Sequence, residues 1–430
     1  MQNMRLLEKK LVKILLYLIV FLLSLYAFLQ AMPKVAFAAD ESQWIHTSTY
    51  FDILRKQGRH SDEWNENYWT LTQPPMPRYV IGFSRLLFGY ESKDLNRPWD
   101  FTYSDEQNIA DGCMPSEGLL LISRFPMSVL AALTSTMIFA LLLDGGGLFA
   151  ASIFVILFIF NDYLKVIMNR AMGDPAFVFF MILTALLTSF AFVALKKIDV
   201  LREPRKFRWV YVLFFLSGLS CGWTGASKIN GLLISVSIAA LIFIQVMFFT
   251  PEWDRQTRFE VIVRAVFVTA IGVLMGFILL NPYLYPNPIY RIGRMFKFRF
   301  QEMAVQFAQF PDQRFDTLTQ KIPVLFNELF AKWMTFSFPG AQFIYFALTI
   351  IGAVHVVKQF FAWNRKGVGS SAVFVLVIIL LPLAIAGYTS PLNWARYFIS
   401  GVLLNLVCIP MAFPEIYSWI KKKKVIHGDQ

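Results

Sequence analysis

The sequence has little of what soluble proteins use to build disulfide frameworks and metal sites. Among 430 residues there are 3 cysteines, far apart in the chain at Cys113, Cys221 and Cys408. An odd number of dispersed cysteines indicates neither a disulfide framework nor a CxxC metal site. The four histidines form no HExxH or other paired-ligand pattern, so no residue pattern supports a metal, and we expect no cofactor.

Charged residues are also scarce. They make up 16% of the chain, against 57% hydrophobic residues, and the mean hydropathy is +0.53. This composition excludes an ordinary soluble domain and indicates an integral membrane protein. The net charge of +12 comes from short basic clusters between apolar runs, so we interpret it as membrane topology. Membrane lipids are therefore expected partners, and nucleic acid is not.

Apolar runs long enough to cross a bilayer recur along the chain. They predict an all-α polytopic membrane protein with about ten transmembrane helices, near residues 13–32, 119–143, 148–167, 175–195, 209–224, 229–249, 265–281, 340–357, 372–389 and 397–417. The N-terminal run resembles a signal peptide that ends in "AFAAD", but residues 14–32 are long enough to span. We therefore expect an uncleaved first helix.

Basic residues set the expected orientation. With the N-terminus in the cytoplasm, the basic segments 196–208, 251–264, 358–366 and 421–424 all fall inside, as the positive-inside rule requires. Two long segments, 33–118 and 282–339, then face outward. Each contains an amphipathic stretch, 74–90 and 291–300, that predicts a helix in the membrane interface, in the first and fourth external loops.

Ionisable residues near the outer ends of the spans are the candidate functional groups, because charge at membrane depth is costly and more often functional than incidental. By this topology they all lie at one face: Asp40, Glu41, Arg170, Asp174, Lys228 and Arg396. Such a set suits a carboxylate base that activates an acceptor while cations hold an anionic group. Asp162 and Lys165 are the nearest charged residues that fall within a predicted span.

Each candidate also has an ordinary structural interpretation. Asp174 precedes a proline and could be the N-cap of a helix. Lys228 could be an interfacial lysine whose amine reaches the headgroups. Arg396 could anchor an aromatic belt beside Trp394 and Tyr397. An acidic pair such as Asp40 and Glu41 outside a span is common.

Taken in order along the chain, several segments resemble membrane glycosyltransferases of the GT-C class. They are "DESQWIHTSTYFDILRKQG", "TQPPMPRYVIGFSRLLFGY", "ISRFPMSVLAALTSTMIFALL", "NRAMGDPAFVFFMILTALL", "GLSCGWTGASKINGLL" and "WARYF". The subgroup that they are most similar to contains protein O-mannosyltransferases and the aminoarabinose transferases of lipid A. The resemblance implies a catalytic membrane module over 1–281, followed by an external segment, 282–339, and C-terminal membrane helices with a basic tail, 340–430.

The resemblance also implies residue roles. Asp40 corresponds to the catalytic base, with Glu41 beside it, and Asp174 corresponds to an aspartate of the second external loop. Cations that bind the carrier phosphate correspond to Arg78 and Lys228, with Arg170 or Arg396 as further candidates. The family's "HPPL" segment corresponds to Gln73, Pro74, Pro75 and Met76, so a glutamine replaces the histidine and any role of that imidazole is in doubt.

The implied activity is transfer of a sugar, with inversion, from a polyprenyl-phosphate donor to a lipid, glycan or protein acceptor at the outer face of the cell membrane. A transporter or flippase of a lipid-linked sugar is the alternative. It would place ionisable residues midway along the spans, whereas here they gather at one face. A structural membrane protein would not require such a set of acids and bases.

Overall fold

The computed structural model describes residues 2–197, 204–250, 252–365 and 372–428. Within these ranges the chain is helical and contains no β-strand, apart from an isolated bridge between Arg314 and Leu392. The predicted all-α class is therefore confirmed. The longer helices are α1 (Gln2–Ala31), α7 (Glu117–Ile159), α9 (Gly173–Lys197), α10 (Pro204–Gly225), α11 (Ile234–Phe249), α12 (Arg255–Ile278), α13 (Pro288–Gln309), α15 (Ala341–Arg365), α16 (Ala372–Thr389) and α17 (Ile399–Gly428).

Short helices fill the two long segments between the predicted spans. They are α2 (Ala39–Thr47), α3 (Thr49–Gln57), α4 (Tyr68–Thr72), α5 (Pro75–Leu87), α6 (Asp105–Ala110) and α14 (Leu318–Asn327). A further short helix, α8 (Asp162–Asn169), lies between α7 and α9. The helices expected from the amphipathic stretches 74–90 and 291–300 correspond to α5 and α13. Their position in a membrane interface stays a prediction.

Eight helices in the described part of the chain are long and apolar enough to cross a membrane by length and composition. They begin at Lys10, Glu117, Gly173, Ile229, Arg255, Ala341, Ala372 and Ala395. A multi-pass membrane protein is thus confirmed, but the predicted count of ten is not. The expected span 148–167 is interrupted, because α7 ends at Ile159 and Asn161 caps the next helix, α8. The kink at Gly147, at φ +76°, falls just before this span.

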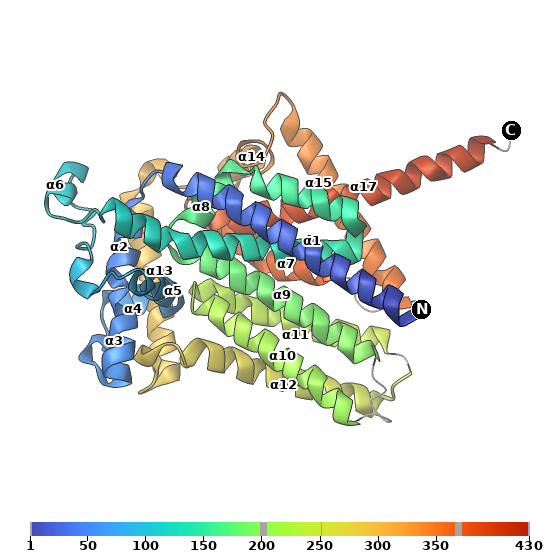
Figure 1. Cartoon of the computed structure of the whole chain (residues 1–430), viewed down its shortest axis with the longest axis horizontal. Coiled ribbons are helices and arrows are strands. Elements are labelled where there is room, and N and C mark those ends of the chain that lie inside the picture. Colours follow the sequence, from blue (N-terminus) through green and yellow to red (C-terminus); the bar gives the residue numbers. More distant parts are fainter. Residues whose placement is uncertain (1, 198–203, 251, 366–371, 429–430) are drawn as a thin grey trace.

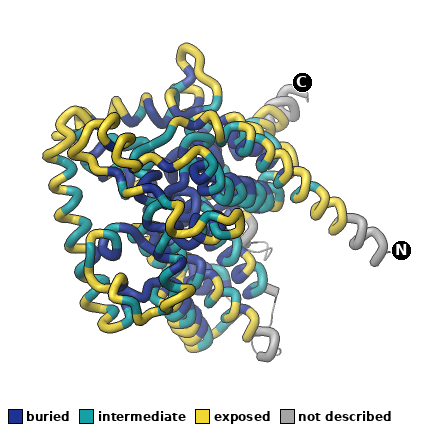
Figure 2. Tube along the Cα trace, turned by 60° about the vertical axis from the view of Figure 1, so that its left-hand side comes forward, coloured by how far each residue is buried: buried dark blue, intermediate teal, exposed yellow. Residues whose placement is uncertain are grey.

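The two ends of the helix bundle differ. Both termini lie at one end in Figure 1, whereas α2 to α6 and α13 gather at the opposite end. The four basic segments predicted to be cytoplasmic lie partly outside the described residues. Figure 2 shows that burial is concentrated in the middle of the bundle, while α1 is exposed over residues 10–15 and partly exposed over residues 16–31. An apolar helix that is exposed in this way is suited to contact with lipid.

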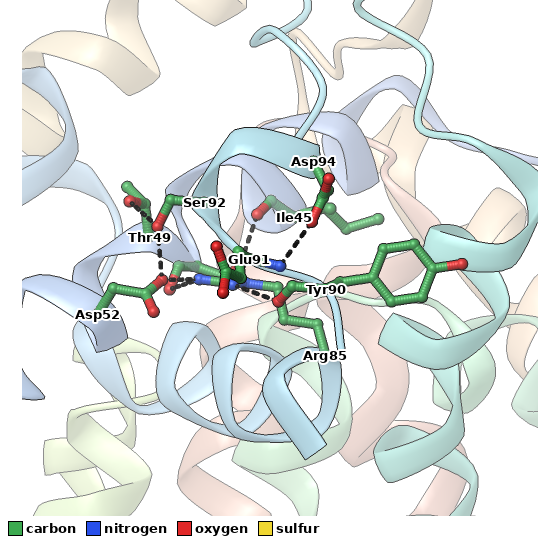
Figure 3. Close-up of polar contacts among 9 residues, drawn as sticks. Ile45, Thr49, Asp52, Arg85, Tyr90, Glu91, Ser92 and Asp94 are labelled. Atoms are coloured by element: carbon green, nitrogen blue, oxygen red, sulfur yellow. Dashed lines mark hydrogen bonds and ion pairs between the residues drawn. The ribbon is translucent and has the colours of Figure 1, made fainter. Parts of the chain in front are cut away.

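Residues 33–118, predicted to face outward and called the first external segment below, are held by a buried ion pair between Arg85 of α5 and Asp52 of α3 (Figure 3). Arg85 also donates to the Ser48 hydroxyl at 2.8 Å and to the Tyr90 carbonyl at 3.0 Å, and Ser92 donates to Asp52 at 2.9 Å. Because these partners satisfy both charges, the pair can be buried without an unpaired polar group. The network holds α3, α5 and the turn after α5 together.

Helices α10 and α12 pack backbone against backbone through two pairs of glycines spaced four residues apart. Gly218 and Gly222 of α10 face Gly272 and Gly276 of α12, and a Cβ atom at any of the four would clash with backbone of the other helix. Small residues at this spacing allow membrane helices to approach closely. This packing matters for the site described below because α10 ends just before Lys228.

We predict that Gly222→Leu lowers the free energy of unfolding by about 1–3 kcal/mol, because the added side chain forces the helices apart. Unfolding of the purified protein in mixed detergent and SDS micelles measures this loss. Gly293→Ala is the matched control, since a Cβ atom there meets nothing within 4 Å. Equal unfolding midpoints for the two variants would contradict the packing described.

Candidate active site

Four segments that are far apart in the chain bring two ion pairs together at the end opposite the termini. Asp40, in the first turn of α2, pairs with Arg396, which lies in the 3₁₀ turn Ala395–Phe398 before α17. Asp174, in the first turn of α9, pairs with Lys228, which follows α10. Arg396 interacts electrostatically with both carboxylates, and Lys228 interacts with Arg396. We call these four residues the charge cluster.

The members of the charge cluster differ in exposure. The Asp174 side chain is 3% exposed, whereas those of Lys228, Arg396 and Asp40 are 24%, 24% and 34% exposed. The sequence left open that Asp174 is the N-cap of a helix. In the structure it is the second residue of α9, so it is not the N-cap. Asp174 therefore serves as a buried partner for Lys228, while Asp40 and the two cations remain accessible.

Glu41 lies next to Asp40 but has a different environment. Its side chain is 0% exposed and forms a bidentate ion pair with Arg124 of α7, at 2.6 and 2.8 Å. The same carboxylate accepts hydrogen bonds from the backbone N–H groups of Ala38 at 3.1 Å and Ala171 at 2.9 Å. These contacts join α2 to α7 and to the turn between α8 and α9. Because Glu41 is enclosed, we interpret it as a positioning residue and do not retain it as a catalytic candidate.

Arg78 is placed differently from the phosphate-binding role that the resemblance implied. It is 1% exposed, its guanidinium lies 4.6 Å from the centre of the Tyr50 ring, and it donates to the Trp69 carbonyl. Burial lowers the pKa of Arg78 to about 10. A guanidinium enclosed in this way stabilises the first external segment and is not open to a carrier phosphate.

Gln73 connects α2 to the segment that precedes α5. Its side-chain oxygen accepts a hydrogen bond from the Thr47 hydroxyl at 2.9 Å. Pro74 and Pro75 follow, and the Met76 N–H donates to the carbonyl of Ala226 at 3.0 Å. Ala226 is two residues before Lys228, so this segment supports the turn that carries the lysine. It does not contribute an ionisable group to the charge cluster.

Arg170 lies in the turn between α8 and α9, four residues before Asp174. Its Nε is buried and has no hydrogen-bond partner within the described residues. An unpartnered buried donor is costly, so a ligand that accepts from it would be stabilised. Arg170 therefore remains a candidate for an anionic ligand, although it forms no ion pair with the charge cluster in the described part of the chain.

Helix α13 adds a further cation to the site. Arg299 donates to the Tyr397 hydroxyl at 3.1 Å, and it interacts electrostatically with Lys228. It also pairs with Glu302, which accepts from the Tyr68 hydroxyl at 3.0 Å. Arginine, tyrosine and glutamate from the two external segments thus border the charge cluster.

Burial shapes the electrostatics of these groups. Desolvation lowers the pKa of Lys228, and the nearby Asp174 carboxylate partly opposes this effect. Burial raises the pKa of Tyr68 well above its usual value, and Glu302 raises it further, so this tyrosine is a neutral hydrogen-bond donor. Within the described residues, no group of three or more His, Cys, Asp or Glu side chains is arranged to hold a metal ion.

The sequence from residue 41 to 281 matches the model of the dolichyl-phosphate-mannose-protein mannosyltransferase family. The chain belongs to this family. This membership confirms the resemblance to GT-C class membrane glycosyltransferases that the sequence motifs predicted. No curated protein matches the chain by sequence.

Solved structures of similar fold support the GT-C architecture. The archaeal oligosaccharyltransferase AglB from Archaeoglobus fulgidus has a TM-score of 0.54 at 13% identity, over 96% of this chain and 52% of that one. ArnT from Cupriavidus metallidurans has a TM-score of 0.52 in the apo state, at 12% identity, over 97% of this chain and 62% of that one. Bound to undecaprenyl phosphate, ArnT has a TM-score of 0.50 at 11% identity, over 93% and 59% of the two chains. This family member thus spans less than two thirds of the length of either protein.

Three features of the site were missed by sequence reasoning. Arg124 lies inside an apolar run, and a charge there is itself a signal of a buried partner. Arg299 was assigned to an interfacial helix, and its amphipathic pattern does not reveal which end of that helix reaches the bundle. Tyr397 was considered only as a residue of an aromatic belt.

We predict that Glu41→Gln lowers the free energy of unfolding by about 3–5 kcal/mol, because it leaves the buried Arg124 charge without a partner. Unfolding in mixed SDS micelles measures this change. The double variant Glu41→Gln, Arg124→Met should recover part of the loss, since no unpaired charge remains. Glu91→Gln is the control, because it removes an exposed pair with Lys93 at 3.7 Å, which is worth about 0–1 kcal/mol. A Glu41 variant as stable as this control would contradict the positioning role.

Proposed function

We propose that this protein is a glycosyltransferase that moves a sugar from a polyprenyl-phosphate donor to an acceptor at the outer face of the membrane, with inversion at the transferred carbon. Membership of the mannosyltransferase family supports the class of reaction. The observation that carries the proposal is the charge cluster, in which an accessible carboxylate and two accessible cations meet at one end of the bundle.

Asp40 is the proposed base. The acceptor's hydroxyl or amine attacks the anomeric carbon of the donor, and its proton passes to the Asp40 carboxylate as the new bond forms. The bond from the anomeric carbon to the phosphate oxygen breaks, and the electron pair leaves with the phosphate. A carboxylate cannot deprotonate a hydroxyl in a separate earlier step, so attack and proton transfer are concerted. Phosphate is a good leaving group, which removes the need for a strong general acid.

Arg396 and Lys228 are the proposed ligands of the carrier phosphate, with Arg299 close enough to add a third positive charge. Cations in a partly buried site stabilise the charge that develops on a leaving group more strongly than they would in water. In the structure these cations form ion pairs with Asp40, Asp174 and Glu302. A bound phosphate competes with those carboxylates, and its arrival would release Asp40 from Arg396 to act on the acceptor.

Aromatic rings lie close to both proposed phosphate-binding cations, Lys228 and Arg396. The Lys228 amine lies 5.6 Å from the centre of the Phe177 ring and 6.0 Å from that of Tyr397. The Arg396 guanidinium lies 5.0 Å from the ring of Trp394. Such contacts favour the charged forms and limit side-chain motion. They suit a site whose ligand is a lipid phosphate at the membrane surface, where apolar and charged groups must coexist.

We place the site outside the cell. The predicted cytoplasmic segments are basic, and the termini lie at the end of the bundle opposite the charge cluster (Figure 1). Transfer would then take place at the outer leaflet, onto a lipid, glycan or protein. The flippase alternative gains no support, because the four residues of the charge cluster lie at helix ends and not midway along the spans.

The proposal is tested by incubating the purified protein with radiolabelled polyprenyl-phosphate sugars and native membrane extract. The account predicts that label enters an acceptor, and that the product has the anomeric configuration opposite to that of the donor. Label that stays on the carrier with every sugar of the panel would contradict the proposed function.

Asp40→Asn is predicted to lower the transfer rate by roughly 10²–10⁴, or about 3–5 kcal/mol of activation free energy, because the proton acceptor is lost. The rate of label transfer measures it, with unfolding midpoints as a check on folding. Asp105→Asn is the control, because it makes the same change at an exposed position of α6. Normal transfer by Asp40→Asn would remove Asp40 as the base.

Lys228→Gln is predicted to raise the KM for the donor by about tenfold or more, because a charge-assisted contact to the phosphate is lost. The KM for the acceptor should change little. Steady-state kinetics with each substrate varied in turn separates the two constants. Lys93→Gln, at an exposed lysine, is the charge-matched control. An unchanged donor KM in Lys228→Gln would argue against phosphate binding at this lysine.

A further inference from the structure

A cavity of about 360 Å³ lies between the two external segments and is open to solvent. One wall comes from residues 59–65, and the other comes from residues 282–291, which include the start of α13. Its volume falls within the range of small-molecule sites. No residue of the charge cluster lines it, so it is separate from the proposed site of transfer.

The cavity has an excess of positive charge. Arg59 and Arg291 line it from opposite walls, with His60 beside Arg59. Neither arginine forms an ion pair in the part of the chain that the structure describes. Arg291 is oriented by its donation to the Tyr283 carbonyl, with its guanidinium 4.8 Å from the centre of the Tyr283 ring. Arg59 is exposed and donates to the His60 ring at 3.5 Å. Two arginines that line one cavity from different segments are suited to bind one anion between them.

The acidic residue of the lining does not cancel this charge. The Asp62 carboxylate accepts a hydrogen bond from the Asn65 side chain at 3.3 Å, so it is directed toward its own segment. Glu66 lies outside the lining and forms its ion pair with Arg294, while its interaction with Arg291 is electrostatic at longer range. The hydroxyl of Ser61 accepts from the Glu63 N–H, which leaves its own hydrogen for a ligand. The lining thus offers arginine forks and a neutral donor, a combination that matches a phosphate group.

Helix α13 connects the cavity to the charge cluster. Arg291 lines the cavity, and Arg299, eight residues further along the same helix, borders the cluster. At 1.5 Å per residue, these two positions are about 12 Å apart along the helix axis. Between them, Arg294 is fixed by Glu66 of the first external segment, which holds the two segments side by side. A molecule about two sugar units long could contact both sites.

We propose that this cavity binds a phosphate group carried by the acceptor, at about 12 Å from the group that receives the sugar. The role as acceptor site rests on the proposed transferase function, whereas phosphate binding by the cavity can be measured without transfer. The phosphate could belong to a soluble or polymeric glycan or to a lipid headgroup. Both sources present the same chemistry to Arg59 and Arg291.

The test measures the affinity of the purified full-length protein for glycerol 3-phosphate, in neutral detergent, by isothermal titration calorimetry. Arg59→Gln should weaken binding by about tenfold, because one charge-assisted contact is lost. Arg55→Gln removes the same charge from an exposed position of α3 outside the cavity and should leave the affinity unchanged. Arg291→Gln provides a second variant from the opposite wall and should weaken binding similarly.

A second arm identifies the source of the phosphate. Native mass spectrometry compares how much phosphatidylglycerol each variant retains from an equal mixture with phosphatidylcholine. A loss in Arg59→Gln relative to Arg55→Gln would support the cavity as a lipid-headgroup site, and a loss confined to glycerol 3-phosphate binding would support a glycan phosphate. Equal behaviour of Arg59→Gln and Arg55→Gln in both arms would overturn the proposal.

Two further variants separate this inference from the proposed function. Lys228→Gln should keep the glycerol 3-phosphate affinity if the cavity is the binding site. Binding that is lost in Lys228→Gln and kept in Arg59→Gln would assign the phosphate to the charge cluster and overturn the cavity proposal. Asp40→Asn should lose transfer while keeping glycerol 3-phosphate binding. If the unmodified protein transfers sugar but Arg59→Gln does not change glycerol 3-phosphate binding, the cavity proposal is contradicted and the proposed transferase function is not.

Discussion

The arrangement of the site depends on the buried carboxylate of Glu41. It binds the guanidinium of Arg124 and accepts from the backbone of Ala171, so it fixes the start of α2 against α7 and against the turn before α9. Asp40 precedes Glu41, and Asp174 lies three residues after Ala171. The separation of the two ion pairs of the charge cluster is therefore set by the fully buried pair of Glu41 and Arg124. A buried ion pair is costly unless its hydrogen bonds are satisfied, and here they are.

The charge cluster combines helix termini with neutralising pairs. Asp40 and Asp174 lie in first turns, where the exposed N–H groups of a helix favour negative charge. Their partners arrive from a turn and from a 3₁₀ segment, both of which can adjust more readily than a helix interior. Each cation is thus paired with a carboxylate, and an anionic ligand would replace that carboxylate as its partner. This arrangement allows several charges to lie close together in a partly buried site without a large cost.

Much of the fold and part of the site could be predicted from sequence. Hydropathy gave the class and most spans, and the positive-inside rule placed Asp40, Asp174, Lys228 and Arg396 at one face. The span 148–167 was wrong as a continuous helix because Asn161 caps a new helix within an otherwise apolar run, and a glycine kink at Gly147 lies just before it. Both signals are local and do not alter hydropathy.

Other features depend on geometry that sequence does not contain. Asp40 and Glu41 are neighbours, and their environments differ because adjacent residues of a helix point about 100° apart. Which one faces the protein interior depends on where α2 begins, and helix boundaries are the least certain part of a sequence-based prediction. The different roles of Arg78 and Arg299 likewise depend on how α5 and α13 pack. Arg78 is enclosed within the first external segment, whereas Arg299 borders the charge cluster.

The most direct test of the central claim is an electron cryo-microscopy structure of the protein with a polyprenyl phosphate bound. The account predicts phosphate density within hydrogen-bonding distance of Arg396 and Lys228, with the Asp40 carboxylate on the side from which an acceptor would approach. Phosphate density at the opposite end of the bundle, or in a position that contacts neither cation, would contradict it.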